Sequence, residues 1–296
     1  MISVLIPIYN FKVSNLINAL HEQLTATNIP FEIICLDDCS AQGFIEDNLK
    51  INRLVNTVLK FSEANNGRIK TRQLLSDQAS YDWLLFLDAD TLPKHNNFIS
   101  NYLNAITSES EVILGGFAYK KESPKKENLL RWKYGKSCEE VKASRRNSHP
   151  YKIIISGNML IKKEVFNMTN SKIIDKTYGL DSYFGSLLKQ NNIKVLHIDN
   201  EVFHMGIEKS ATYLKKKEEA SDTLLTLLNE NKIVVHNNNL LSWFLALKRF
   251  RLHYFFSYFF ILFNSILKKN LLSSYPIITL LQFYRLSYMC YSYLKR

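Results

Sequence analysis

The sequence predicts an α/β protein with a mostly parallel central sheet flanked by helices, and three observations support this fold class. Short apolar runs alternate with helical segments as far as about residue 204. Several runs are continuously apolar, which is typical of strands buried on both faces. Two of them end in acidic residues, as expected where strands reach the open edge of a sheet. With 296 residues, 46% of them hydrophobic, the chain can bury a sizeable core.

Each predicted element follows from its local pattern. Apolar runs that end at polar or turn-forming residues predict strands at 2–8, 31–36, 57–61, 83–87, 112–117, 153–155, 159–161, 194–198 and 201–204. Segments with helical spacing predict helices at 14–24, 68–79, 96–106, 180–190 and 209–230. Because strands and helices alternate, most neighbouring strands should run parallel.

Two stretches depart from this alternation. Residues 118–150 hold ten basic and four acidic residues with little apolar periodicity, so we expect a mobile or partly helical excursion on the surface. The polar run at 235–239 predicts a linker. We therefore expect a main domain at 1–235, built from halves 1–117 and 118–235, and a separate tail at 240–296.

The positive charge of the chain is concentrated in its tail. The net charge is +11, and nine basic residues but no acidic residue follow Glu230. The four cysteines show no C-x-x-C spacing, which argues against a zinc site or a disulfide framework and suits a reducing compartment. The N-terminus lacks the basic and long apolar regions of a signal peptide. No run of about 20 apolar residues predicts a simple membrane-spanning helix.

Asp88 and Asp90 directly follow the apolar run Trp83–Leu87. A buried strand excludes a lone ionised carboxylate, so both side chains should lie just past its carboxyl end, where open α/β sheets bind ligands. Positions i and i+2 of an extended chain point the same way. Two carboxylates held together favour a hard cation such as Mg²⁺ or Mn²⁺. The alternative is a helix N-cap ahead of Pro93, which needs only one aspartate.

Two further groups are expected near the same sheet edge. Asp38 ends the apolar run 31–36, where its carboxylate is placed to accept a hydrogen bond from the N–H of a base; a simple turn is the alternative. Gly67 and Arg72 lie at and after the start of the helix at 68–79. A helix N-terminus favours phosphate, and arginine offers a forked donor. The alternative for Arg72 is a solvated helix face.

Five segments, in this order and spacing, resemble the inverting glycosyltransferases of family 2, which have the A-type nucleotide-sugar transferase (GT-A) fold. The resemblance covers about residues 1–206 and rests on Val4–Asn10, Leu36–Ser40, Asn66–Arg72, Asp88–Asp90 and Gly179–Asp181. It implies that 1–117 is a nucleotide-binding half and 118–235 an acceptor-side half. The segments 156–161 and 202–206 also look like family blocks.

The resemblance implies roles for the residues at the donor site. Asp38 would contact the base, and Pro7 and Tyr9 would form the wall beside it, although ordinary packing is the alternative for Tyr9. Asp90 would be the direct ligand of a divalent metal, with Asp88 inclined toward the ribose.

The implied site has two further groups on later segments. His204 would be a third metal ligand beside Asp88 and Asp90, with a packed core histidine as the alternative. Gly157 would let the backbone approach a sugar and Asn158 would bind its hydroxyls, or this segment is a plain bulge or turn.

Asp181 is the candidate general base. Inverting transfer needs a carboxylate that takes the proton of the acceptor hydroxyl as its oxygen attacks the anomeric carbon. Relatives usually place an acid immediately before this aspartate, whereas this chain has Leu180. The departure puts acceptor binding in question. The alternative is that Asp181 only caps the helix that follows.

The tail holds 16 of the 37 aromatic residues of the chain. The uncharged run at 252–267 would reach only about 24 Å as a helix, short of the roughly 30 Å bilayer core. Basic flanks on such a run suit helices that lie in a membrane interface. The alternatives are a helical cap or a dimer interface. No nucleic-acid motif or dense basic stripe is present, so we expect no nucleic-acid partner.

These observations predict a metal-dependent enzyme that moves a hexosyl or N-acetylhexosaminyl group from a nucleotide-diphosphate donor to a hydroxyl acceptor. The tail suggests a lipid-linked saccharide acceptor in bacterial surface-glycan synthesis, at the cytoplasmic face of the cell membrane. The alternatives are an inactive sugar-nucleotide-binding relative or a nucleotidyltransferase on a similar sheet. The latter usually carries a Gly-rich phosphate loop after its first strand, which this chain lacks.

Overall fold

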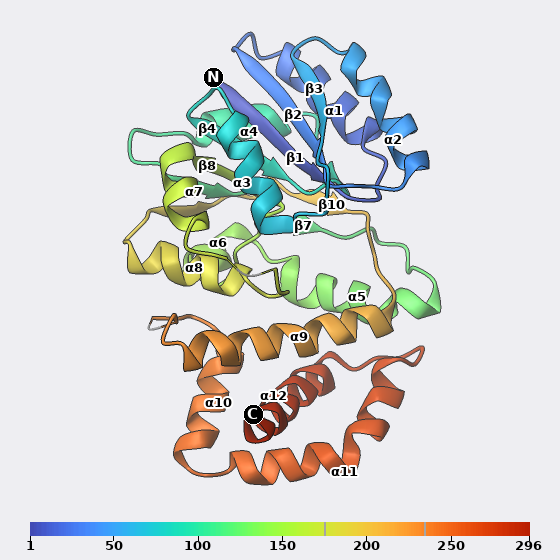
Figure 1. Cartoon of the computed structure of the whole chain (residues 1–296), viewed down its shortest axis with the longest axis vertical. Helices are drawn as coiled ribbons and strands as arrows, with labels where there is room; N and C mark the ends of the chain where they lie inside the picture. The colour runs from blue at the N-terminus through green and yellow to red at the C-terminus, as the bar shows by residue number, and fades with distance from the viewer. Residues whose placement is uncertain (175, 234) are drawn as a thin grey trace. The chain divides into compact units, whose positions relative to one another are not determined.

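The computed structural model describes residues 1–174, 176–233 and 235–296. It is an α/β protein with a seven-stranded sheet in the order β3-β2-β1-β4-β8-β6-β9 and a three-stranded sheet in the order β5-β10-β7 (Figure 1). The strands are β1 Ile2–Ile8, β2 Phe31–Asp37, β3 Thr57–Phe61, β4 Trp83–Leu87, β5 Thr91–Pro93, β6 Val112–Leu114, β7 Phe117–Ala118, β8 Asn158–Lys162, β9 Val195–His197 and β10 Val202–His204. Only β8 runs antiparallel to its neighbours in the large sheet, so the predicted fold class is confirmed.

The helices alternate with these strands as the sequence predicts. Their bounds are α1 Ser14–Thr25, α2 Gln42–Asn48, α3 Arg68–Gln78, α4 Phe98–Ala105, α5 Leu129–Tyr134, α6 Ala143–Asn147, α7 Lys163–Asn170, α8 Asp181–Gln190, α9 Ser210–Asn229, α10 Asn239–Arg249, α11 His253–Leu271 and α12 Ile278–Lys295. Short 3-10 turns occupy Leu49–Arg53 and Lys126–Asn128, and a π-helical turn occupies Gly135–Glu139. Three predictions were wrong in part, and each has a local cause given below.

The large sheet has a topological switch point at β1, where the strand order changes sides. Strands β1, β2 and β3 add outward on one side, and β4 then pairs with the other side of β1. Pairing between β1 and β4 ends at Leu5 and Phe86, so Pro7 lies beyond the last pair and its missing N–H costs no ladder bond on that side. The two strands therefore leave an opening at their carboxyl ends, the place where open α/β sheets bind ligands.

The small sheet begins with Thr91, directly after Asp90. Strand β5 pairs with β10 so that Thr91 lies opposite His204, which brings the end of β10 beside the acidic segment. The predicted strand at 112–117 is instead β6 and β7, separated by Gly115 and Gly116. An added Cβ at Gly115 would lie 2.3 Å from a backbone oxygen, so close packing forces the interruption there.

Two other predictions are corrected. Residues 153–155 form no strand, because the chain there turns toward β8, which starts only at Asn158. The segment 118–150 is partly helical, as predicted, because α5 and α6 lie in it, but it is not wholly a surface excursion: Arg131 and Arg146 are 6% and 1% exposed and carry internal hydrogen bonds. A basic composition concealed these buried positions because most other basic residues of the segment do face solvent.

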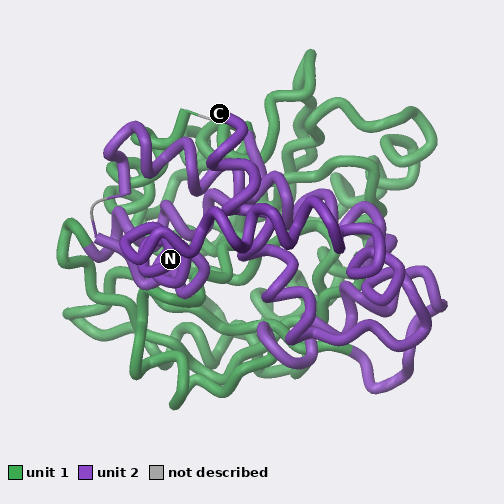
Figure 2. The backbone as a smooth tube through the Cα atoms, turned by 90° about the horizontal axis from the view of Figure 1, so that it is seen from below, with its two compact units in different colours: residues 1–119, 140–176, 190–206 green, residues 120–139, 177–189, 207–296 purple. Residues whose placement is uncertain are grey.

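The described chain forms two compact units (Figure 2). Unit 1 comprises 1–119, 140–176 and 190–206, and unit 2 comprises 120–139, 177–189 and 207–296. Unit 1 holds both sheets, with a core formed mainly by β1, β2, β4, α1 and α4. Unit 2 is helical, its bounds differ from those of the predicted division, and within it α9 packs with α12.

The C-terminal helices of unit 2 lie partly where the sequence predicts. Pro276 ends the segment between α11 and α12, while α10 begins at Asn239, directly after the predicted linker. Asn238 caps α10 by accepting a hydrogen bond from the Leu241 N–H. Among the described residues, no individual helix has both the length and the hydropathy to cross a bilayer. The pair α10 and α11 meets that measure only jointly, with a bend of 113° between them.

Candidate active site

Two arginines of α3 neutralise Asp88. Arg72 donates from Nη2 to Oδ1 at 2.6 Å, and Arg68 donates from Nη2 to Oδ2 at 3.0 Å. Burial raises the pKa of the Asp88 carboxyl, but the charges of Arg68 and Arg72 outweigh this effect and the pKa is lowered overall. Both carboxylate oxygens are thus engaged by cations, so Asp88 is poorly placed to be a direct metal ligand.

The two arginines occupy different environments. The Arg72 side chain is 4% exposed, and it also donates to the Ser156 carbonyl oxygen at 3.0 Å. The Arg68 side chain is 43% exposed and donates to the Ser156 hydroxyl at 3.1 Å. The predicted phosphate-binding role of Arg72 is therefore corrected: Arg72 is a buried support for Asp88. Arg68, one turn earlier, is the arginine that reaches solvent.

Gly157 makes room for the Asp88 carboxylate. A Cβ at this position would lie 2.3 Å from Oδ2 of Asp88, and the Gly157 carbonyl accepts the Asp88 N–H at 3.2 Å. The close backbone approach predicted at Gly157 exists, but it is to a carboxylate of the protein. Asp88 is consequently held on one side by arginines and on the other by the backbone before β8.

Asp90 faces His204. Its Oδ2 lies 3.7 Å from His204 Nε2, and a Cβ at Gly206 would lie 2.1 Å from the same oxygen. Burial raises the pKa of Asp90; the charge of His204 opposes this shift and that of Asp88 adds to it. A nearby cation would offset both effects that raise the pKa.

Asp90 and His204 fit a divalent ion as a pair. Two ligands about 2.1 Å from one ion lie at most about 4 Å apart, which their separation satisfies. Within the ranges that the structure describes, no group of three or more His, Cys, Asp or Glu side chains gathers to hold a metal. Mg²⁺-type sites on nucleotides need only one or two protein ligands, because phosphate and water oxygens supply the others.

Asp38 organises the loop before α3. Its Oδ1 accepts hydrogen bonds from the Asn66 N–H at 2.8 Å and side chain at 3.2 Å, and its Oδ2 accepts one from the Gly67 N–H at 2.8 Å. Gly67 has φ of +79°, a conformation that favours glycine. The aspartate thus fixes the start of α3, and a carboxylate with these three bonds keeps about one further acceptor position for a base.

The predicted wall residues lie at the same end of β1. Tyr9 is 56% exposed and Pro7 is partly buried. The next residue, Asn10, adopts φ of +50° and is tied to the end of β2: its N–H donates to the Ser40 hydroxyl and its side chain accepts the Ala41 N–H. The exposed ring of Tyr9 is therefore held beside the opening between β1 and β4.

Asn158 has a structural role instead of the predicted sugar contact. It is fully buried, and its amide donates to the carbonyl oxygens of Gly116 and Asn200 at 2.8 and 2.9 Å. Its Oδ1 accepts the Tyr102 hydroxyl at 2.7 Å. Both amide hydrogens are thus used within the protein, which leaves no donor for a sugar hydroxyl.

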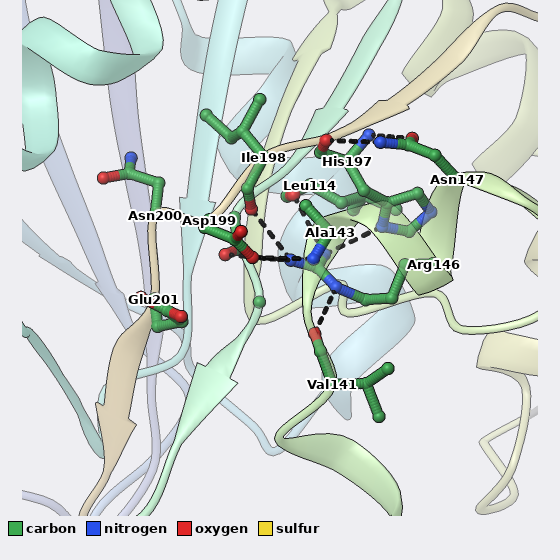
Figure 3. Close-up of polar contacts among 12 residues, drawn as sticks. Leu114, Val141, Ala143, Arg146, Asn147, His197, Ile198, Asp199, Asn200 and Glu201 are labelled. Atoms are coloured by element: carbon green, nitrogen blue, oxygen red, sulfur yellow. Dashed lines mark hydrogen bonds and ion pairs between the residues drawn. The ribbon is translucent and has the colours of Figure 1, made fainter.

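A buried arginine supports the segment that leads into β10. Figure 3 shows Arg146 surrounded by backbone oxygens; it donates to Val141 at 2.8 Å, Leu114 at 3.2 Å and Ile198 at 2.8 Å. Its Nη1 also lies 2.8 Å from His197 Nδ1. An arginine only donates, so Nδ1 accepts and His197 is neutral, with its Nε2–H directed at the Pro150 oxygen.

His197 makes the stability of the protein pH-dependent. Burial, together with the charge of Arg146, lowers its pKa to about 4, although the bond to Pro150 opposes the shift. The unfolded pKa is about 6.5, so this stability is complete above pH 6.5 and is lost as the pH falls toward 4. Between pH 7 and 5 the wild type should lose about 2 kcal/mol more unfolding free energy than His197→Gln.

Urea unfolding at the two pH values measures this difference. The same pH dependence in the wild type and the variant would show that the pKa of His197 is the same in the folded and unfolded states.

Asp181 is the first residue of α8, in unit 2, whereas Asp38, Asp88, Asp90 and His204 belong to unit 1. Its role as the base stays a prediction. The residue before it, Leu180, is 5% exposed. An apolar side chain suits that buried position, which accounts physically for the departure from the family pattern.

Sequence reasoning missed Arg68, Ser156 and Gly206. Arg68 precedes Arg72 by four residues, so the two share one face of α3, and that spacing was a usable signal. Ser156 acts by accepting hydrogen bonds from Arg68 and Arg72, and Gly206 acts by leaving room for Asp90; no local pattern reveals either contact.

Comparisons with known proteins agree with this fold. The glycosyl transferase family 2 profile matches residues 3–168, more than half of the chain, so the chain belongs to this family. It is 36% identical over 91 residues to an uncharacterized glycosyltransferase of Haemophilus influenzae, covering 30% of this chain and 29% of that protein. It is 30% identical over 95 residues to another of Rickettsia bellii, covering 32% and 14%. The chain thus matches less than a third of either relative.

Solved structures show the same fold at low identity. Residues 1–349 of S. aureus TarS superimpose with a TM-score of 0.51 at 19% identity, covering 76% of this chain and 65% of that one. The Pyrobaculum calidifontis mannosyltransferase PcManGT, in complex with GDP-Man and Mn²⁺, gives 0.53 at 13% identity, covering 77% and 64%. A Mycobacterium tuberculosis glucosyl-3-phosphoglycerate synthase, in complex with Mg²⁺ and UDP, gives 0.52 at 11% identity, covering 80% of each chain. The predicted nucleotide-sugar transferase fold is confirmed.

Proposed function

We propose that this protein is a metal-dependent, inverting glycosyltransferase that moves a hexosyl or N-acetylhexosaminyl group from a nucleotide-diphosphate donor to a hydroxyl acceptor. One observation carries the proposal: the two acids of the Asp88–Asp90 segment have different partners at the same sheet opening. Asp88 is neutralised by two arginines, whereas Asp90 lies 3.7 Å from an imidazole, and its pKa stays raised by burial despite the charges of His204 and Arg68. The second acid therefore suits a cation, and the first suits the positioning of an arginine.

The residues divide the work of donor binding. Arg72 and Gly157 hold Asp88, and Asp88 holds Arg68, whose exposed guanidinium is placed to bind phosphate oxygens. Asp90 and His204 would hold a divalent ion, and that ion, when bound, would stabilise the charge on the departing diphosphate. Mn²⁺ and Mg²⁺ in two structural neighbours support this assignment. Tyr9 and Asp38 would receive the base.

Asp181 would take the proton of the acceptor hydroxyl as its oxygen attacks the anomeric carbon and the bond to the diphosphate breaks. Inversion follows from a direct displacement. Asp181 is the first residue of α8, so the helix backbone fixes the position from which its side chain extends.

The function is tested by nucleoside diphosphate release from UDP-, GDP- and dTDP-sugars, with and without Mn²⁺. We expect one donor to raise the melting temperature in a Mn²⁺-dependent manner, and an acceptor to induce release that EDTA abolishes. Asp90→Asn should lose the Mn²⁺ dependence, while Asp47→Asn, in exposed α2, should keep it. Donor binding without release would instead identify a binding protein, and release of pyrophosphate would identify a nucleotidyltransferase.

The exposed face of α11 supports a membrane-bound acceptor. Its side chains at helical spacing are large, apolar and exposed: Tyr254, Phe255, Tyr258, Ile261, Leu262 and Ile266, here called the α11 stripe. Basic residues flank it at Arg251, Lys268 and Lys269. An exposed apolar stripe with basic ends, in a tail without acids, suits an anionic membrane surface. We infer a lipid-linked saccharide acceptor in bacterial surface-glycan synthesis, with the protein peripheral on the cytoplasmic face of the cell membrane.

Vesicle sedimentation tests the membrane contact. Phe255→Asp should weaken binding to phosphatidylcholine–phosphatidylglycerol vesicles at least tenfold, because a charge replaces an apolar group in the proposed contact. Phe255 is 63% exposed, so folding should survive. Val55→Asp makes the same change at a 72% exposed position of unit 1 and should bind as the wild type does. Equal binding by both variants would exclude the α11 stripe as the contact.

A further inference from the structure

Two cations of unit 2, on α5 and α9, lie over the rings of two tyrosines, and a third, on α12, lies within electrostatic reach. The Arg131 guanidinium of α5 lies 5.0 Å from the ring centre of Tyr213, and the Lys217 ammonium of α9 lies 4.4 and 4.8 Å from those of Tyr134 and Tyr213. The charge of Arg285, on α12, acts on both Lys217 and Tyr134. We call Arg131, Lys217 and Arg285 the unit 2 cation cluster.

The charge of this cluster is only partly balanced. Glu139 pairs with Arg131 at 3.0 Å. Two acids of α9 have other partners: Glu218 pairs with Lys268 and accepts the Tyr284 hydroxyl, and Asp222 accepts the hydroxyls of Tyr288 and Ser292. Glu139 is the carboxylate whose charge acts on Lys217 together with the charges of Arg285 and Arg131.

Buried donors of the cluster lack acceptors. Among the residues that the structure describes, the Tyr213 hydroxyl and the Arg285 Nε are buried with no hydrogen-bond partner. Lys217 is only 9% exposed, and its ammonium makes no hydrogen bond or ion pair with any residue that the structure describes. A buried donor without an acceptor is unfavourable, so donors of this kind in one place favour the binding of a group that accepts hydrogen bonds.

Two further observations fit an anion at this place. The turn that carries Cys138 and Glu139 beside the cluster is π-helical, a geometry often found at functional sites. The pKa of Lys217 is lowered to about 7, first by burial and then by the charges of Arg285 and Arg131. A bound anion would offset all of these effects, because it stabilises the charged ammonium.

We propose that Arg131, Lys217 and Arg285, together with the Tyr213 hydroxyl, form a binding site for a phosphate group. A phosphate offers several oxygen acceptors and up to two negative charges, which matches converging donors and an excess of positive charge. Phosphate binding stands on the cluster alone. That the acceptor substrate carries this phosphate rests on the proposed function, and the same chemistry would recognise a free phosphate or a lipid headgroup.

The site is tested with the full chain in phosphate-free buffer with EDTA, so that metal-mediated binding is absent. Calorimetric titration with inorganic phosphate and pyrophosphate measures the free ions. Phosphatidylcholine vesicles with phosphatidic acid, compared with vesicles of equal charge containing oleate, measure a lipid phosphate. We expect preference for phosphate in at least one arm, and the arm that shows it identifies the source.

Variants assign the binding to the cluster. Lys217→Met and Arg285→Gln should each weaken phosphate binding at least tenfold, and either variant suffices if the other fails to fold. Lys215→Met makes the same charge change at an exposed position of α9 and should bind within twofold of the wild type.

Either of two results would overturn the proposal: no preference for phosphate in both arms, or unchanged binding in folded Lys217→Met and Arg285→Gln. In that case the lysine between two rings would be a structural cation–π contact. The measurement needs neither donor nor metal, so a failure of glycosyl transfer would not obscure it.

Discussion

Replacing Asp181 with asparagine should lower turnover by a factor of about 10² to 10⁴ while the affinity for the nucleotide-sugar donor stays within twofold of the wild type. The reason is that the amide cannot take the proton of the acceptor hydroxyl. Asparagine is as good as aspartate near a helix N-terminus, so any capping of α8 survives. Nucleoside diphosphate release measures turnover, and a donor thermal shift measures binding.

The preserved cap separates the two interpretations of Asp181. If the residue only supports α8, Asp181→Asn should turn over at the wild-type rate, and the base would have to be sought elsewhere. Asp47→Asn serves as the matched control, because Asp47 is a partly exposed aspartate of α2 paired with Lys12.

Replacing Arg72 with methionine should lower the unfolding free energy by about 3–5 kcal/mol. The Arg72 side chain is 4% exposed, and its loss leaves Asp88 with a buried oxygen that no longer faces a cation. Arg68→Met removes the other partner of the same carboxylate, but that side chain is 43% exposed, so the cost should be at most about 1 kcal/mol. Urea unfolding at pH 7 measures both changes.

Donor binding should depend on Arg68 more than stability does. Arg68→Met should weaken the affinity for the donor although it lowers the unfolding free energy little, because Arg68 is the arginine open to solvent. Adding Asp88→Asn to Arg72→Met should recover part of the lost stability, since the carboxylate charge is then gone and the charge that remains, that of Arg68, is on a side chain 43% exposed to solvent. Equal destabilisation by the two single variants would contradict the division between a buried support and an exposed binding group.

The sheet and the acidic segment could be predicted because local patterns determine them. Trp83–Leu87 is continuously apolar and its end is acidic, so both the strand and the position of Asp88 and Asp90 followed from the sequence. Family resemblance correctly indicated the fold. Burial on both faces and the alternation of elements can be recognised in short stretches of sequence, so they can be predicted without knowledge of the tertiary structure.

The partners of the site residues could not be predicted in the same way. Arg72 and Asn158 both have the chemistry of ligand-binding groups, and the structure buries both. Which polar residue faces inward depends on contacts such as those of Arg72 with Ser156 and of Asn158 with Asn200, which join segments 84 and 42 residues apart. The same limit concealed the buried arginines of the segment 118–150.

Gly157 and Gly206 have a consequence for how donor preference can change. Each acid of the Asp88–Asp90 segment rests against one of these glycines, one directly before β8 and one shortly after β10. The position of each carboxylate therefore depends on the register of a neighbouring strand, β8 or β10, as well as on its own rotamer. Adaptation to a differently sized diphosphate sugar would proceed by insertions or deletions in the loops that feed those strands, whereas substitutions along the walls of the opening would alter only which base or sugar it prefers.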